Sequence, residues 1–324
     1  MDFLDKKGIF LILAVWIVLL CLSSDIATEP VRGNSDSPII VCTTNVLGSI
    51  VEQYVGNQTE VVVLAQPGLC PADYDIKPSD IEAVSKAKVL FYHGIMGEYW
   101  LDDLIEASGN TNITKIKISG PWNTPEGAKR YIRWIGGNLS QILGIDLNET
   151  MNAMIEEIDR VSSDIQNEAA SLGVNETKVI CMQWQASFVS WVGFDVVATY
   201  GPPQMLSTAD IQNLTETAKK EGVALVIDNL QSGTEVGNTI ATECNAIHVA
   251  LSNFPGALPQ TETLAKMIEH NARELFYAVK TWRSTRELRA QNSSLQTQLM
   301  VFQSTTAIIL VIAVVEAILL YRRK

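Results

Sequence analysis

The residues of this chain that are best suited to chemistry gather in one loop, 65–84, with the sequence AQPGLCPADYDIKPSDIEAV. Cys70, Asp73 and Asp75 are side chains of the kinds that bind metal ions, and they stand close together. Proline and glycine mark the stretch as a loop, and Pro78-Ser79-Asp80 is typical of a helix start. The spacing therefore predicts either a metal-binding loop or a loop whose aspartates only cap the turn and the helix.

The loop belongs to a repeating pattern of short apolar segments and helices that begins after Pro38. The apolar segments form two groups of four: 39–43, 60–65, 88–93 and 113–118, then 178–182, 195–200, 224–229 and 247–252. Continuous apolar strands that alternate with helices predict parallel sheets covered on both faces. We expect an α/β fold of two lobes, each with a four-stranded, mainly parallel sheet.

The segment between the two groups has helical patterns. The stretch 125–143 reads as a helix with a break at Gly136-Gly137. Apolar residues on one face predict a longer helix over 149–172, with Asn148 as its N-cap and Gly173 as its stop. This pattern predicts a first lobe, a connecting helix and a second lobe over residues 38–145, 146–173 and 174–283.

Polar and aromatic residues follow the predicted strands. Ligands of open α/β sheets bind beyond the carboxyl ends of the strands, so these residues are candidates for a binding site. No glycine-rich phosphate loop is present, and three histidines form no recognisable Ser-His-Asp or Cys-His set. We therefore expect a binding protein and no enzyme. The candidates are Asn45, Cys70, Asp73, Tyr74, His93, Trp122, Gln183, Trp184, Gln185 and Asp228.

Both ends of the chain carry membrane signals. Within 1–30, two lysines, an apolar run and a polar exit predict a signal peptide or an uncleaved N-terminal anchor. A transmembrane helix is expected over 304–321, after a polar helical stalk, 284–303, whose apolar repeat is too sparse to predict a coiled coil. The basic tail, 322–324, places the C-terminus in the cytoplasm. The body is expected outside the cell, held by a single C-terminal anchor.

Charge and sequons agree with an exterior body. The net charge of −12 argues against a nucleic-acid partner. Four cysteines follow the leader; their pairing stays open, with Cys42 and Cys181 expected to be buried free thiols. Asn-x-Ser/Thr sequons predict a glycoprotein. They begin at Asn57, Asn112, Asn138, Asn148, Asn175, Asn213 and Asn292.

The stretch 43–105 carries a resemblance. Its Pro-x-x-Tyr-x-x-x-Pro-Ser-Asp frame, 71–80, and its Trp100-Leu101 pair are similar to the metal-receptor family (cluster A-I) of ABC-transporter solute-binding proteins. The similarity continues along most of 39–280. With its C-terminal anchor, the chain resembles an archaeal-like, membrane-anchored member of this family. The resemblance implies two lobes joined by one long helix, limited lobe closure, and capture of Zn²⁺ or Mn²⁺ between the lobes for an ABC permease in the membrane.

The resemblance also gives positions for the metal ligands, and this chain departs from the family at each of them. The two ligand histidines of the family fall on Ala72 and Gly120, the third ligand within 183–185, and the carboxylate near 252–253. None is present as such. Cys70, Asp73, His93 and Asp228 are the side chains that we expect to bind a divalent metal instead.

Two other interpretations stay open. In the first, the cargo is a chelated metal or a small organic solute, held by stacking and amide hydrogen bonds. The residues for this cargo would be Asn45, Tyr74, Trp122, Gln183, Trp184 and Gln185. In the second, the chain is a glycosylated surface protein that binds no solute. The oligomeric state is not predicted.

Overall fold

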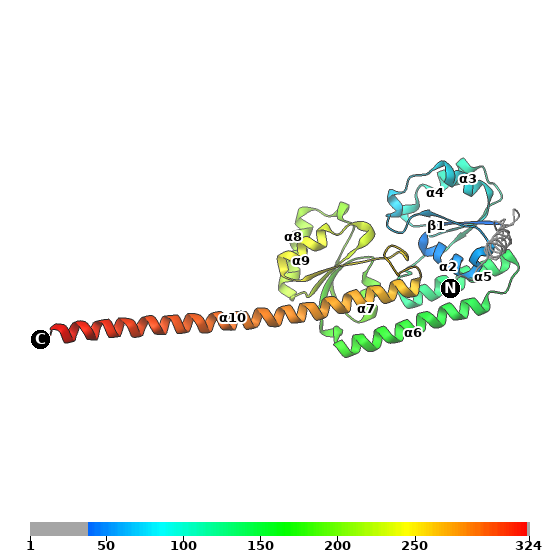
Figure 1. Ribbon diagram of the computed structural model, residues 1–324. Helices are drawn as coiled ribbons and strands as arrows, with labels where there is room; N and C mark the ends of the chain where they lie inside the picture. Colours follow the sequence, from blue (N-terminus) through cyan, green and yellow to red (C-terminus); the bar gives the residue numbers. More distant parts are fainter. Residues whose placement is uncertain (1–37, 323–324) are drawn as a thin grey trace, which may run out of the picture. The chain divides into compact units, whose positions relative to one another are not determined.

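The computed structural model describes residues 38–322, and its elements belong to one compact unit, Ile39–Lys324 (Figure 1). The predicted leader and the last two residues of the basic tail lie outside the described residues. Within them, the two predicted four-stranded parallel sheets are confirmed.

The first lobe has the strand order β2-β1-β3-β4. Its strands are β1 (Ile39–Thr44), β2 (Val61–Ala65), β3 (Ala87–Tyr92) and β4 (Thr114–Lys117). Helices α2 (Asn45–Val55) and α5 (Pro125–Leu143) cover one face, and α3 (Pro78–Lys86) and α4 (Leu101–Ser108) cover the other. Because alternate strand residues point to opposite faces, Ile40 and Cys42 enter one core and Val41 the other.

The second lobe repeats this arrangement with the order β6-β5-β7-β8. Its strands are β5 (Lys178–Met182), β6 (Asp195–Tyr200), β7 (Leu225–Asn229) and β8 (Ile247–Leu251). Helices α8 (Thr208–Glu221) and α9 (Glu235–Cys244) cover one face, and α7 (Ala186–Val192) and α10 (Leu264–Arg322) cover the other. Short 3-10 turns are η1 (Gly56–Gln58), η2 (Pro71–Asp73), η3 (Met96–Glu98), η4 (Val174–Glu176), η5 (Pro203–Met205) and η6 (Leu230–Ser232).

Helix α5 is continuous, so the predicted break at Gly136-Gly137 is wrong. Gly136 allows α2 and α5 to approach each other closely, because a Cβ there would lie 2.4 Å from the Tyr54 hydroxyl oxygen. That hydroxyl donates to the Ile132 carbonyl at 2.8 Å and fastens α2 to α5. The glycine therefore serves helix packing and does not interrupt the helix.

The predicted connecting helix is α6 (Asn148–Leu172). Gly173 ends it in the left-handed conformation, as expected. Asn148 is not the N-cap: Leu147 takes that position without a side-chain cap, and the Asp146 carboxylate accepts from the Asn148 backbone N–H at 2.9 Å.

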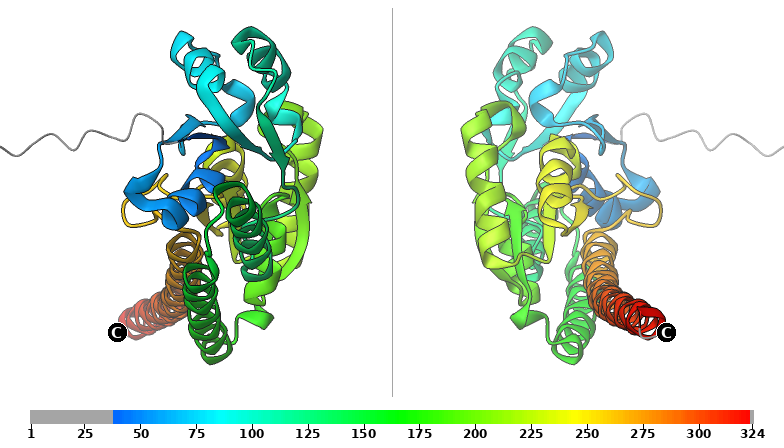
Figure 2. Two further views of the ribbon diagram at one scale, coloured as in Figure 1. Left: turned by 90° about the vertical axis from the view of Figure 1, so that its right-hand side faces the viewer. Right: turned by 90° about the vertical axis from the view of Figure 1, so that its left-hand side faces the viewer.

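One apolar core runs through both lobes. It contains buried residues of α2, α5, α6, α7 and α10 together with one face of each sheet. Figure 2 shows α6 and α10 side by side along this core. A shared core of this kind resists wide separation of the lobes, since opening them would expose apolar surface to water.

Candidate functional site

The surface between the lobes is built from the loops at the carboxyl ends of the strands. His93, which follows β3, is fully buried there. Its Nε2 lies 2.7 Å from the Thr44 hydroxyl and its Nδ1 lies 3.1 Å from the Tyr131 hydroxyl. The ring stacks on Trp122, with centroids 4.6 Å apart. Burial lowers the pKa of His93 to about 3, so the imidazole is neutral and both of its nitrogens are engaged.

Trp122 and the next residue reach across to the second lobe. The Trp122 indole N–H donates to the Asn253 carbonyl at 2.6 Å. The Asn123 amide donates to the Trp184 carbonyl at 2.9 Å and to Asn253 Oδ1 at 3.0 Å. These three bonds join the loop before α5 to the loops that follow β5 and β8.

Two further amides complete the contact. Asn45 donates to the Pro255 carbonyl at 2.6 Å, and Gln231 donates to the Pro67 carbonyl at 3.2 Å. Gln231 also accepts from the Asn253 backbone N–H at 3.1 Å. We call Asn45, Trp122, Asn123, Gln231 and Asn253 the interlobe amide cluster. All of its members are uncharged, and each of these hydrogen bonds joins a group of one lobe to a group of the other or joins two members of the cluster.

Gln185 lies next to this cluster and is incompletely satisfied. It is fully buried, and its Nε2 donates to the Leu251 carbonyl at 3.1 Å. Its Oε1 is buried without a hydrogen-bond partner, the one such side-chain atom among the described residues. A buried acceptor without a donor costs about 1–3 kcal/mol. This atom is thus an unsatisfied acceptor beside the interlobe amide cluster.

The structure does not bring the four predicted metal ligands together. Cys70 is partly exposed, Asp73 is exposed, and His93 has its nitrogens engaged. Within residues 38–322, no three His, Cys, Asp or Glu side chains are placed to hold a metal ion. All four cysteines of this region are free, and Cys42 and Cys181 are buried thiols as expected.

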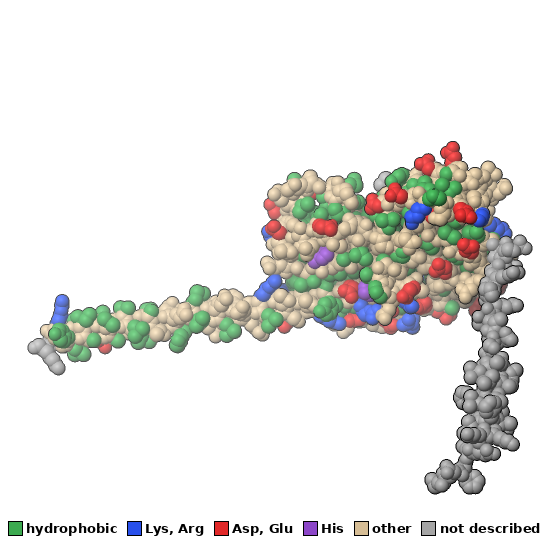
Figure 3. Space-filling model, turned by 45° about the horizontal axis from the view of Figure 1, so that its top comes forward, with side chains coloured by type: hydrophobic (Ala, Val, Ile, Leu, Met, Phe, Trp, Pro, Cys, Tyr) green, Lys and Arg blue, Asp and Glu red, His purple; other side chains and the backbone are tan. Residues whose placement is uncertain are grey.

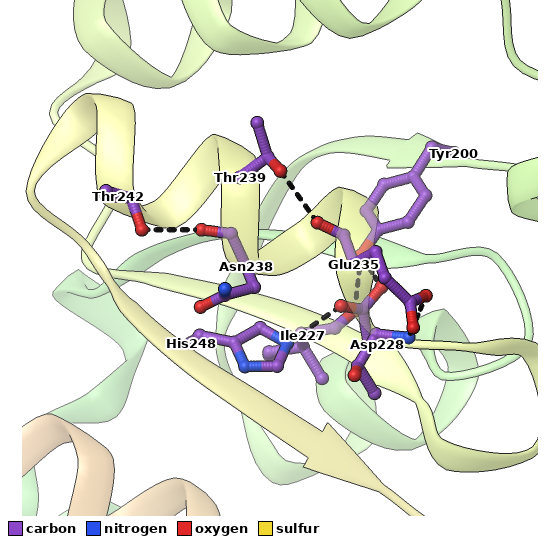
Figure 4. Close-up of polar contacts among 9 residues, drawn as sticks. Tyr200, Ile227, Asp228, Glu235, Asn238, Thr239, Thr242 and His248 are labelled. Atoms are coloured by element: carbon purple, nitrogen blue, oxygen red, sulfur yellow. Dashed lines mark hydrogen bonds and ion pairs between the residues drawn. The ribbon is translucent and has the colours of Figure 1, made fainter.

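Asp228 lies on the far face of its sheet, under α9 (Figure 4). The Tyr200 hydroxyl donates to its Oδ1, and His248 Nε2 lies 2.7 Å from its Oδ2. A Cβ on Gly237 would lie 2.1 Å from Oδ2, so α9 packs tightly over the carboxylate. Both oxygens are used within the second lobe, and this side chain does not face the first lobe.

The loop that resembles a ligand loop keeps its frame. Tyr74 is buried against Trp100, and its hydroxyl donates to Asp80. Burial, followed by that hydrogen bond, raises the pKa of Tyr74. The Trp100 indole donates to the Pro71 carbonyl at 2.8 Å. Tyr74 therefore holds the loop on the first lobe and lies in that lobe's core. Gln183 and Trp184 are exposed.

Several polar residues of this region are not predicted by the sequence pattern. Asn123 follows Trp122 directly and Gln231 lies three residues after Asp228, in stretches without strand or helix signals. Glu98 is buried, and its carboxylate accepts from Thr43 and from the backbone N–H groups of His93, at 3.1 Å, and Gly94. It shapes the loop after β3. Its position inside a short turn gave no periodic signal.

Comparisons with known proteins agree with this architecture. The sequence profile of the family described as ZnuA, zinc-uptake complex component A periplasmic, matches residues 40–278. The manganese-binding lipoprotein MntA of Halalkalibacterium halodurans is 26% identical over 111 residues, 34% of this chain and 37% of MntA. The manganese ABC transporter substrate-binding lipoprotein PsaA of Streptococcus pneumoniae is 29% identical over 112 residues, 34% of this chain and 33% of PsaA. The alignments thus span about a third of these relatives.

Solved structures share the fold. A zinc-bound deletion mutant of ZnuA superposes with a TM-score of 0.63 at 20% identity, over 75% of this chain and 98% of the mutant. A manganese-bound periplasmic metal binding protein of Candidatus Liberibacter asiaticus gives 0.64 at 11% identity, over 75% of this chain and 100% of that one. Together with a profile match over most of the chain, the two lobes, the connecting helix and the retained loop frame show that this chain belongs to the ZnuA family of zinc-uptake complex component A proteins.

Proposed function

We propose that the chain is the membrane-anchored, extracytoplasmic solute-binding receptor of an ABC importer, and that its cargo is a divalent metal, Zn²⁺ or Mn²⁺, carried as a complex. Family membership and the metal-binding names of its relatives support the metal. The function is capture: the lobes close on the cargo, remove its water and present it to a permease. No bond is made or broken, and no residue has a catalytic role.

The chemistry of the interlobe surface supports a metal complex over a bare ion. A tight site for free Zn²⁺ needs imidazole, thiolate or carboxylate ligands. The interlobe amide cluster offers neutral amides and an indole, and Gln185 Oε1 adds a buried acceptor. Such groups bind the organic part of a chelate by hydrogen bonds and stacking. The unpartnered Oε1 of Gln185 is the observation that carries this proposal.

The ends of the chain support the location. Within the described residues, one helix, α10, is long and apolar enough to cross a membrane, by length and composition. Its final residues are basic, which favours a cytoplasmic C-terminus. Six of the seven sequon asparagines are exposed and Asn138 is half-buried, so the folded body leaves room for glycans.

A glycosylated surface protein without cargo is the second candidate. The direct bonds between the lobes favour it, because Asn123 and Gln231 already satisfy the groups they face. A bare-ion site that uses Cys70 and Asp73 is the third, because Asp73 is exposed and Cys70, a free thiol, is partly exposed.

A melting-temperature screen separates these candidates. The purified full-length protein is heated with free Zn²⁺ and Mn²⁺, and with the same ions as their citrate and histidine complexes, since a ligand that binds the folded form raises the melting temperature. We expect a shift with a complex that is lost in Gln185→Leu and kept in Cys70→Ser. A shift with free ions that is lost in Cys70→Ser or Asp73→Asn would favour the bare-ion site. No shift with any of them, in a protein that purifies without metal, would favour the surface protein.

A further inference from the structure

Helix α10 continues far beyond the second lobe. Every side chain from 286 to 322 is exposed. Figure 3 shows this part of the helix with hydrophobic side chains along it and few charged ones before its tip. Between 284 and 299, the large apolar side chains are Leu288, Leu295 and Leu299, which are 65%, 62% and 55% exposed.

These three side chains belong to a longer pattern. Two series of residues each recur at intervals of seven, the second displaced by four, which is the spacing of a coiled-coil seam. We call their ten positions the α10 seam. The first series is Leu288, Leu295, Phe302, Ile309 and Glu316, and the second is Asn292, Leu299, Thr306, Ala313 and Leu320.

The α10 seam faces away from the lobe that carries it. Val279 is fully buried in the core of the second lobe. Leu288 follows nine residues later, which is about two and a half turns of an α-helix and places it on the opposite side. The lobe therefore leaves the seam uncovered and leaves space beside it for another helix.

We propose that the α10 seam is the interface of a parallel dimer of two copies of this chain. Two copies anchored in one membrane by the same end have the same direction, so like positions of the seam meet. The residues that flank such a seam decide which partner fits. Here Gln291 faces Gln296 of the second copy, and Gln298 faces Gln303. Neutral amides bond to one another without repulsion, so the surface is complementary to itself.

The two polar seam residues fit the same partner. A single asparagine among apolar seam positions favours two helices in fixed register, because it pairs with its own copy. Asn292 is that residue, and the leucines of the other series stand on each side of it. Glu316 lies in the apolar end of α10, where lipid offers it no hydrogen-bond partner. In the dimer the two Glu316 side chains meet, and they bond to each other when one of them carries a proton, since two carboxylates would repel. Thr306 and Ala313 are small enough to let the helices approach.

In the dimer, the sequon at Asn292 differs from the other six in whether it can carry a glycan. Asn292 begins an Asn-Ser-Ser sequon, and a glycan on it would hold the helices apart. Asn292 is therefore unmodified in the dimer. This inference does not depend on the cargo, so it can hold or fail whatever the metal screen gives.

Cysteine cross-linking in native membranes tests the interface. Leu295→Cys puts a thiol on the seam, and Thr297→Cys puts one on the far side of the same helix turn. Under mild oxidation of the full-length chain at matched expression, we expect about fivefold more disulfide-linked dimer from Leu295→Cys than from Thr297→Cys, as the seam geometry requires. The unsubstituted chain measures the background of its own cysteines. Equal cross-linking of the two variants would overturn the proposal.

Three further variants make the test specific. Ser294→Ala removes the sequon and keeps Asn292, and the dimer fraction should not change. A dimer that appears only in Ser294→Ala would overturn the proposal for the natural chain. In lipid nanodiscs, the mass of the natural chain should be that of two copies, and a single-copy mass would also overturn it. Glu316→Leu should lower the dimer fraction, while Glu316→Gln, which still pairs by hydrogen bonds, should preserve it.

Discussion

Two histidines of this protein have partners of different charge. His93 lies at the interlobe surface among neutral groups: Thr44, Tyr131 and the ring of Trp122. His248 lies inside the second lobe against a buried carboxylate, Asp228, with 23% of its side chain exposed. The chain thus keeps a carboxylate–imidazole pair inside the second lobe, under α9, and keeps neutral amides where the lobes meet.

This difference bears on what the protein can hold. A divalent ion between the lobes would need imidazole, thiolate or carboxylate ligands there, and the Asp228–His248 pair that could supply them is turned toward α9. The interlobe surface instead suits a cargo that brings its own ligands. Four substitutions test the contrast.

Loss of His248 should have the largest effect. In His248→Ala, the buried Asp228 carboxylate loses its imidazole partner and keeps only the Tyr200 hydroxyl. Removing a hydrogen-bond partner of a buried carboxylate leaves one of its oxygens unsatisfied, and we expect the free energy of unfolding to fall by about 3 kcal/mol. Urea unfolding of the full-length protein in detergent measures it. His270→Ala, at a half-buried histidine of α10, is the matched control and should stay within about 0.5 kcal/mol. An equal loss of unfolding free energy in both variants would contradict the role of His248 as the partner of the buried Asp228 carboxylate.

The low pKa of His93 should make stability depend on pH. The folded protein holds this group at a pKa of about 3, below the value near 6.5 of an unfolded chain. Between these values the unfolded chain binds a proton that the folded chain rejects, so stability falls as pH falls from 6.5 toward 3. At pH 5 the loss relative to neutral pH is about 2 kcal/mol from this group. His93→Gln removes it, so the urea midpoints at pH 7 and pH 5 should lie closer together than in the natural chain. An unchanged gap would show that His93 is not neutral in the folded protein.

Asn123→Ala should loosen the contact between the lobes. The variant loses two bonds to the second lobe, to the Trp184 carbonyl and to Asn253 Oδ1. We expect a loss of about 1–2 kcal/mol and faster amide hydrogen exchange over 252–255. Asn167→Ala, at an exposed position of α6, is the control and should leave that exchange unchanged. Equal amide hydrogen exchange over 252–255 in the two variants would contradict the role of Asn123 in joining the lobes.

Trp122→Phe should give the smallest effect. The aromatic ring still packs on His93, and only the N–H bond to the Asn253 carbonyl is lost. A loss of about 1 kcal/mol is expected from one buried hydrogen bond. Trp191→Phe, at a partly buried indole, is the comparison and should cost less. A larger loss at Trp191 would indicate that packing, and not the bond between the lobes, decides the result.

Much of the fold could be predicted from the pattern of apolar residues. The eight strands begin and end within two residues of the expected positions, because most of them are continuous apolar runs bounded by polar residues; β4, with the sequence TKIK, is the exception. The one wrong break, at Gly136-Gly137, arose because glycine has two uses. It interrupts a helix when nothing packs against it, and it permits close packing when a side chain such as Tyr54 does.

The site was less predictable, and β7 shows why. Its residues are all buried, so the run has no alternation that tells which side chains point to which face. Asp228 and Asn229 are neighbours at the end of this strand, yet only the packing of α9 decides that the aspartate lies beneath that helix. Similarly, the frame around Ala72 indicated the shape of a loop, while the partners of His93 come from α5 and β1, distant in sequence.

The continuity of α10 has a mechanical consequence. No glycine or proline occurs after Pro259, and the helix that is buried in the second lobe is the same helix that reaches its exposed tip. Twenty residues of helix, the length of the predicted stalk, span about 30 Å. The stalk therefore acts as a lever arm without a joint. A tilt or rotation of its tip turns the second lobe by the same angle. The helix therefore sets both the distance of the second lobe from the tip and the orientation of that lobe.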